Sequence, residues 1–175
     1  MKKFIFLLIL VFQFISPDIS YSQEITDATK AAAAKAPLSK LAGTWWMDED
    51  VKFVLNANGK GTAYFPNMSG SEIFKYSVSF TLQKKGDKIR GTLNGPNDGF
   101  SHTIIDRTRY NNADKDGIKI WLNMAKAAAM SRVECIEGTL LYIDNNYFAI
   151  YNPEWGRTTW FEKDAHFKKS QALKE

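Results

Sequence analysis

Few side chains in this chain are suited to catalysis or to metal binding. The 175 residues include one Cys, Cys135, and two His, His102 and His166. One Cys excludes an intrachain disulfide and a zinc site built on several thiolates, and two distant His exclude a multi-His metal site within one chain. His102 directly follows Ser101, and because adjacent strand residues point to opposite faces, these two cannot act as base and nucleophile.

The other candidates for chemistry are isolated groups or acidic turns. Cys135 lies in an apolar run and is expected to be a small buried hydrophobic residue. His166 lies in a polar tail and is expected to be solvated. The acidic residues 48–50, and Asp114 with Asp116, are read as solvated turns, because they lack the alternating oxygen ligands and the Gly of calcium loops. The sequence therefore predicts no metal, no cofactor and no enzyme activity.

Composition limits the class of partner. The chain is 45% hydrophobic, 14% aromatic and 24% charged, which is typical of a globular protein rich in aromatic residues. Its formal net charge is +4, and the basic residues are spread along the sequence. Nucleic-acid binding requires a concentrated basic face, so no nucleic acid is expected as a partner.

Residues 1–22 are predicted to be a secretory signal peptide. A positively charged start is followed by the apolar stretch Phe4–Ile15, and Ser20 and Ser22 are small residues suited to cleavage before Gln23. The apolar stretch is shorter than the roughly 20 residues that a membrane-spanning helix needs. We therefore expect an exported protein, periplasmic or secreted from a Gram-negative bacterium, without a stable membrane span after cleavage.

Two terminal segments differ from the central part of the chain. Residues 23–40 form an alanine-rich arm that Thr26 or Asp27 can cap and that Pro37 ends, so it is either a short helix or a flexible tether. Residues 165–175 form a polar tail, and a short helix is expected over residues 164–174. Residues 41–164 remain as one domain.

The central domain alternates apolar and polar residues with a period of two. In residues 74–82, every second side chain is apolar, which predicts a strand with one buried face. Similar alternation recurs around residues 51–55, 89–93, 133–143 and 148–150, and at Ile118, Ile120 and Leu122. Short turns rich in Asn, Gly and Asp separate these runs. Residues 123–131 break the pattern and are predicted to be either a lid of one or two turns or a widened connection.

Short connections between strands favour an all-β, up-and-down antiparallel barrel of about 8–10 strands. There is no room for crossover helices, so consecutive strands are expected to pair as hairpins. Closure buries the apolar face and removes exposed edges. A two-sheet sandwich is the alternative, but it usually needs a long connection, and these turns offer no obvious one.

Three features of this domain resemble the lipocalins. Gly43-Thr44-Trp45 is similar to their Gly-x-Trp signature at the first strand, and the segment 143–151, with Asp144 and Tyr147, is similar to a conserved late turn of that family. Arg157 lies where lipocalins place an arginine across the tryptophan. The resemblance covers residues 41–163 and is of the kind seen in small exported proteins of Bacteroidetes-type bacteria.

The resemblance implies structural roles for these residues and a small hydrophobic ligand. Trp45 would close one barrel end with Arg157 stacked on its face, although plain core packing of Trp45 is the alternative. A lipid or fatty acid would lie in an apolar interior, with Tyr76 as one polar group. The expected lining residues are Phe53, Tyr64, Phe74, Tyr76, Phe80, Ile104, Ile120 and Phe148.

Two other functions remain open at this stage. The aromatic side chains are numerous enough to fill the barrel completely, which would make the protein an envelope interaction or structural module without a ligand. A hydrolase or isomerase would instead need a polar cluster inside the barrel, for example Glu137 near His102 or Arg109.

Overall fold

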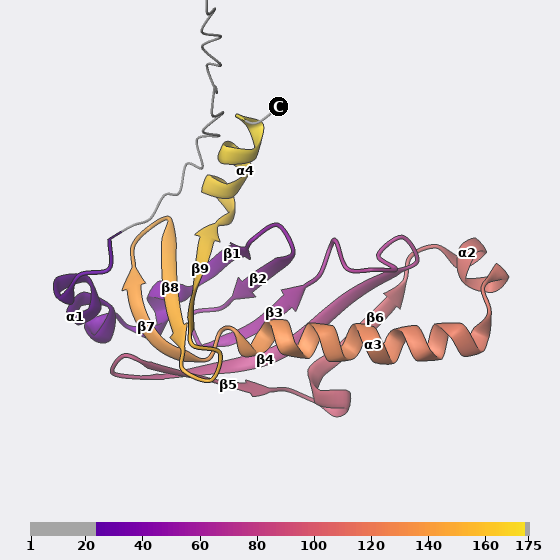
Figure 1. Cartoon of the computed structure of the whole chain (residues 1–175), viewed down its shortest axis with the longest axis horizontal. Helices are drawn as coiled ribbons and strands as arrows, with labels where there is room; N and C mark the ends of the chain where they lie inside the picture. The colour runs from indigo at the N-terminus through magenta and orange to yellow at the C-terminus, as the bar shows by residue number, and fades with distance from the viewer. Residues whose placement is uncertain (1–23, 174–175) are drawn as a thin grey trace, which may run out of the picture.

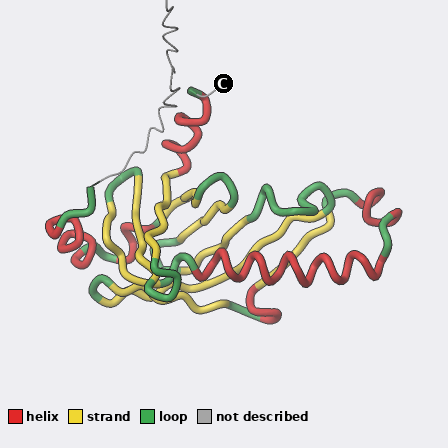
Figure 2. The backbone as a smooth tube through the Cα atoms, in the orientation of Figure 1, coloured by secondary structure: helices red, strands yellow, loops and turns green. Residues whose placement is uncertain are grey.

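The computed structural model describes residues 24–173, in which strands predominate (Figures 1 and 2). The strands of this part are β1 (Gly43–Met47), β2 (Val51–Leu55), β3 (Lys60–Tyr64), β4 (Phe74–Lys85), β5 (Lys88–Leu93), β6 (Phe100–Ile104), β7 (Gly138–Ile143), β8 (Tyr147–Asn152) and β9 (Arg157–Lys163). The helices are α1 (Asp27–Lys35), α2 (Arg107–Asn112), α3 (Lys115–Glu134) and α4 (Asp164–Ala172), with the 3₁₀ turns η1 (Leu38–Leu41) and η2 (Pro96–Gly99). The predicted signal peptide, residues 1–22, lies outside the described residues.

The sheet closes into an antiparallel barrel, which confirms the predicted fold class. Eight strands follow one another in the order β3-β2-β1-β9-β8-β7-β5-β4, and β4 pairs again with β3. Every pairing is antiparallel, and most neighbours are consecutive in the chain. The predicted meander is therefore present, and the sandwich alternative is wrong.

Strand β4 extends beyond this ring. It has 12 residues, and its buried positions alternate with exposed or half-buried ones, as the sequence predicts. Along one edge it pairs with β5 through Phe80–Lys85 and with β6 through Phe74–Val78. Strand β6 thus lies outside the ring, on the part of β4 that leaves the barrel.

Helix α3 replaces a predicted strand and lid. Alternation at Ile118, Ile120 and Leu122 predicts a strand, and residues 123–131 are predicted to form a lid or a widened connection. Both predictions are wrong, because residues 115–134 form one helix of 20 residues. The buried positions of α3 recur with a helical period: Ile118, Ala125, Ala129 and Val133. The helix packs against β4 and β6, and Figure 1 shows it running along that side of the sheet.

The start of α3 explains part of this difference. The Asp114 carboxylate accepts a hydrogen bond of 2.7 Å from the Gly117 backbone N–H and caps the helix. The Asp116-Gly117 pair, predicted as a hairpin turn, therefore lies in the first helical turn. Asn111 and Asn112, which are of the type expected in the short turns between strands, lie in α2. In both places the residues of a turn also suit a helix start or end, and the alanine-rich run that follows decides in favour of helix.

The two terminal helices agree with the sequence prediction. At α1, the Thr26 hydroxyl accepts a hydrogen bond from the Thr29 N–H, and Thr29 bonds back to Thr26. Helix α1 packs against β7 and buries Ala33 completely, so the arm is a docked helix rather than a tether. At the other end, α4 packs against β1 and β9.

Candidate functional site

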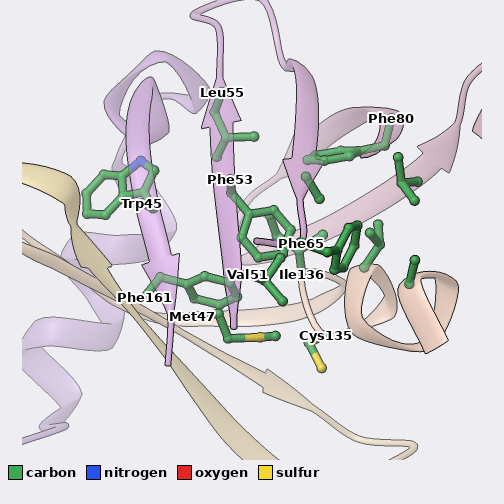
Figure 3. Close-up of a cluster of buried hydrophobic side chains, with 14 of the residues drawn as sticks. Trp45, Met47, Val51, Phe53, Leu55, Phe65, Phe80, Cys135, Ile136 and Phe161 are labelled. Carbon is green, nitrogen blue, oxygen red and sulfur yellow. The ribbon is translucent and has the colours of Figure 1, made fainter. Parts of the chain in front are cut away.

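The interior of the ring is filled by aromatic side chains. The rings of Phe148 and Phe161 stack at 4.3 Å, and Trp45 meets Phe148 edge to face at 4.8 Å. The centre of the Phe53 ring lies 5.5 Å from that of Phe161 and 6.0 Å from that of Phe80. Figure 3 shows Trp45, Phe53, Phe80 and Phe161 gathered from β1, β2, β4 and β9. These five rings are at most 1% exposed.

The eight predicted lining residues do not form one cavity. Phe53, Phe80 and Phe148 lie in the filled interior, and none of them borders a cavity that the structure describes. Phe74 and Tyr76 are buried on the extended part of β4, where Ile104 of β6 is half-buried nearby. Two placements are wrong.

The two misplaced residues point away from the interior. Tyr64 lies on the outer face of β3 and is 43% exposed. Ile120 lies on α3 and is 64% exposed, because the segment that carries it is helical. Only the side chains of β2, β4 and β8 were placed on the correct face by the period of two.

A lysine, rather than the predicted Arg157, covers Trp45. The Lys163 ammonium group lies 4.1 Å from the centre of the Trp45 ring and donates a 2.9 Å hydrogen bond to the Ala42 carbonyl. The indole N–H of Trp45 donates to the Leu41 carbonyl at 2.8 Å. Burial, together with the charge of Lys40, lowers the pKa of Lys163. The end of the barrel is thus closed by a cation over the indole face.

Gly43 allows this lysine to approach. Its φ is +131°, and a Cβ at this position would lie 2.2 Å from the Lys163 Nζ. The Gly-x-Trp pattern therefore has a local physical reason, since a side chain at residue 43 would require a strained backbone and would displace the lysine. Arg157 instead stacks on Trp155 at 4.8 Å, near Cys135.

Asp144 and Tyr147 organise the β7–β8 turn. One Asp144 carboxylate oxygen accepts hydrogen bonds from the Asn146 and Tyr147 backbone N–H groups at 2.7 and 2.6 Å. The other accepts the Tyr142 hydroxyl at 2.8 Å. The Tyr147 hydroxyl contacts His166 and Glu162. These residues fix a turn and a helix contact.

The residues considered for catalysis lie apart. His102 pairs with Tyr76, whereas Glu137 lies against Gly91, which pairs with Leu82. Six residues of strand separate the two positions on β4, or about 20 Å. His166 is half-buried and bonded to Glu162 and Tyr147, so its predicted solvation is wrong. Within residues 24–173, no group of three or more His, Cys, Asp or Glu side chains is arranged to hold a metal ion.

A cavity with a largely apolar lining lies on the outer face of the sheet. It has a volume of about 400 Å³, and we call it the outer groove. It is lined by Trp46, Lys52, Tyr64, Phe65, Pro66, Ser71, Phe74, Lys75, Tyr76 and Ile105. Three of the predicted lining residues, Tyr64, Phe74 and Tyr76, meet here rather than inside the barrel.

Strand register creates the outer groove. Trp46 pairs with Lys52 across β1 and β2, and Lys52 pairs with Tyr64 across β2 and β3. Side chains that face each other across antiparallel strands are neighbours on the same face. The pairing of β3 with β4 ends at Tyr64, which faces Ser77. Strand β4 begins three residues earlier, at Phe74, and this first part of β4 has no partner on β3, so the groove lies where the two strands part.

Trp46 is held rigidly at one end of the groove. Its indole N–H donates a 2.8 Å hydrogen bond to Asp164, and its ring stacks on Phe167 of α4 at 4.7 Å. Burial would raise the pKa of Asp164, but hydrogen bonds from Trp46 and Lys168, with the charges of Lys168 and Lys52, outweigh it and lower the pKa. Asp164 therefore stays ionised and fixes the indole.

The outer groove is basic. Among residues 24–173, no Asp or Glu lines it, whereas Lys52 and Lys75 do. Lys52 lies 4.0 Å from Asp164, but Lys75 is exposed and forms no ion pair with any residue from 24 to 173. The Lys75 ammonium group is therefore available to an anion beside an apolar wall.

The neighbouring cavity has the opposite charge. On the other side of Trp46, a cavity of about 390 Å³ lies under α4 and is bordered by Asp48, Glu49 and Glu162. No Lys or Arg of the described part of the chain lines it. An anionic ligand is therefore repelled from this cavity and attracted to the outer groove.

Comparisons with known proteins add no relative. No family model matches the chain, and no curated protein and no solved structure is similar to it at a significant level. Among the helices of the described part, none combines the length and apolar character needed to cross a bilayer. The functional assignment therefore depends on the geometry of the chain itself.

Proposed function

We propose that this protein is an exported, non-catalytic, lipocalin-like barrel that binds a small amphipathic molecule with an apolar body and an anionic group. The ligand lies in the outer groove, and a fatty acid is the simplest member of this class. Its apolar part contacts Trp46, Tyr64 and Ile105, and its anionic group lies beside Lys75.

The observation that carries the proposal is the combination of an apolar cavity with an unpaired cation. Tyr64 and Ile105 are 43% and 51% exposed, so the ligand can remove apolar surface from water. Lys75 has no carboxylate partner in the described part of the chain, and the groove lining contains no acid that would repel an anion. Both halves of an amphipathic anion therefore find a matching surface.

The packed aromatic rings favour this location over the barrel interior. A ligand between Phe53 and Phe148 would have to displace Phe161, whose ring contacts both of them and is fully buried. Such cores are packed as densely as organic crystals, so a displaced ring loses close contacts on every side. The outer groove needs no such opening.

Binding is tested by titrating the chain with dodecanoate and with dodecanol, followed by calorimetry. The wild-type chain is expected to bind dodecanoate more tightly, because only the carboxylate is attracted to Lys75. Lys75→Gln should weaken dodecanoate binding roughly two- to fivefold, as expected for an exposed ion pair, and leave dodecanol binding unchanged. Lys85→Gln is the matched control, since Lys85 is an exposed lysine at the other end of β4. Absence of binding to both compounds would contradict the proposal.

Export is a separate part of the proposal. It is supported by the charged start, the apolar stretch Phe4–Ile15 and the small residues before Gln23. The mass of the mature protein recovered from its native host should correspond to a chain that begins at Gln23. A mature chain that retains Met1 or Lys2 would contradict export by cleavage.

The second candidate function is a ligand-free interaction module, and the filled interior favours it. In that case, native mass spectrometry of freshly purified protein should give only the mass of the chain, and dodecanoate should not bind. Co-purified lipid supports the first proposal instead, provided that less of it is found with the Lys75→Gln variant.

A further inference from the structure

Strand β6 has a free edge. Every other strand described here has a partner on both edges, because the eight-stranded ring closes. Strand β6 pairs only with β4, through Phe74–Val78. A strand with one free edge presents unpaired N–H and C=O groups, to which another strand can add.

The hydrogen bond at the end of the β4–β6 ladder shows which groups point outward. The Ile105 N–H donates a 2.8 Å hydrogen bond to the Ile73 carbonyl. Backbone groups of an antiparallel strand point alternately to its two sides. Thr103 and Ser101 therefore direct their backbone groups toward β4, and those of His102 and Ile104 point to the free edge.

The free edge lacks the usual protection against pairing. Ser101, His102 and Thr103 are all exposed. Between Phe100 and Ile104 there is no Pro, Lys, Arg, Asp or Glu, the residues with which natural sheets block their edges. The Phe100 end is partly closed by η2, because the Phe100 N–H bonds to the Asn97 carbonyl and the Phe100 carbonyl accepts a long hydrogen bond of 3.5 Å from the Asn97 side chain, which leaves this carbonyl a second lone pair.

The sequence of β6 is complementary to itself when it is read in the antiparallel direction. With His102 at the centre, Ser101 faces Thr103 of a second copy, and Phe100 faces Ile104. Hydroxyl residues thus meet on one face of the sheet and apolar residues on the other, which is the pattern that cross-strand pairs favour. A partner of this register needs no sequence other than that of the chain.

We propose that β6 pairs with β6 of a second copy, related by a two-fold axis at His102, to form a homodimer with a sheet continuous across both chains. The two His102 residues exchange N–H···O=C hydrogen bonds. On each side, the Ile104 N–H donates to the Phe100 carbonyl of the partner. The interface is isologous and closes at two copies.

Proline substitutions test this geometry with an internal control. His102→Pro removes an N–H that points to the free edge, so the barrel keeps its own ladder while dimerisation is blocked. His102→Thr keeps the N–H and is the matched variant. Sedimentation equilibrium from micromolar to near-millimolar protein should show dimers for wild type and His102→Thr, but only monomer for His102→Pro. Circular dichroism should show an unchanged fold for both variants.

The outcomes are decisive in both directions. A wild-type chain that stays monomeric over this range overturns the proposal, as does a His102→Pro chain that dimerises like wild type. An unrelated extended peptide that pairs with β6 while the chain stays monomeric would place a different partner on this edge. None of these results depends on fatty-acid binding.

Discussion

The closed ring and its extension differ in how completely their side chains are buried and hydrogen-bonded. In the ring, Phe53, Phe148 and Phe161 are fully buried, and Phe161 stacks on Phe148 and meets Phe53 edge to face. In the extension, formed by the first half of β4 with β6 and α3, the buried hydroxyl of Tyr76 has no hydrogen-bond partner within residues 24–173. Here α3 also leaves Ile120 64% exposed.

This difference follows from topology. Closure gives every strand of the ring two neighbours, so both its backbone groups and its interior are saturated. The extension has one open edge and a helix over only one face, so more of its side chains and backbone groups stay exposed than in the ring. The ring therefore supplies stability, and the surfaces available for binding lie where β4 leaves it.

The largest expected effect is in the ring. Trp45→Ala should lower the free energy of unfolding by about 3–5 kcal/mol, because the indole is 1% exposed and its loss leaves a cavity beside Phe148. Chemical denaturation followed by circular dichroism measures this change. Ile120→Ala, on the exposed side of α3, is the matched substitution in the extension and should change stability by less than about 0.5 kcal/mol. Equal losses for both variants would contradict the contrast between the two regions.

A smaller effect is expected at the end of the ring. Gly43→Ala should cost about 1–3 kcal/mol, because φ at this residue is +131° and an L side chain is strained there. The contact with Lys163 can relax, since its ammonium end is flexible, but the backbone cannot. The double variant Gly43→Ala with Lys163→Ala should therefore recover little of the stability in thermal melts. Full recovery would mean that the steric contact, rather than φ, requires glycine.

In the extension, the loss of one buried polar atom should not lower stability, in contrast to the substitutions in the ring. Tyr76→Phe removes an unpartnered buried hydroxyl, so stability should stay the same or rise by about 1 kcal/mol. Burial, and then the charge of Glu72, raises the pKa of Tyr76, so the phenol is neutral at physiological pH. The control is Tyr147→Phe in the ring, which loses contacts to His166 and Glu162 and should be destabilised. Urea denaturation of both variants decides the sign.

The smallest effect concerns pH and the outer face of the ring. The folded pKa of Asp164 lies below its ordinary value of 3.8. A lowered pKa gives a stabilising contribution that is present above the unfolded pKa and is lost as pH falls through the folded pKa. The difference in stability between wild type and Asp164→Asn should therefore shrink below about pH 4. Trp46 fluorescence during acid titration reports the release of the indole, and a pH-independent difference would contradict the assigned role.

The sequence alone predicted the strands best where one face is uniformly apolar. Alternation over residues 74–82 identified β4 and its buried face correctly. At Ile118, Ile120 and Leu122 the same alternation was misleading, because residues 118 and 122 also share one face of a helix, whereas Ile120 then points away and is 64% exposed. The alanines at 125 and 129 favour the helix, because helical spacing brings both to the buried face of α3.

The sites depend on strand register, which the sequence does not reveal. Lys163 covers Trp45 because β1 and β9 pair these two residues directly, whereas Arg157 lies at the other end of β9. Trp46, Lys52 and Tyr64 likewise become neighbours only through pairing across three strands. In the structure all three side chains lie on the outer face, but no local signal in the sequence indicates that they share a groove.

The most direct test of the account is an amide NMR titration of the chain with dodecanoate. Binding in the outer groove should shift the signals of Tyr64, Lys75 and Ile105 together, while those of Phe53 and Phe148 in the ring interior stay in place. Shifts concentrated at Phe53 and Phe148, with Lys75 unaffected, would contradict it and place the ligand inside the barrel.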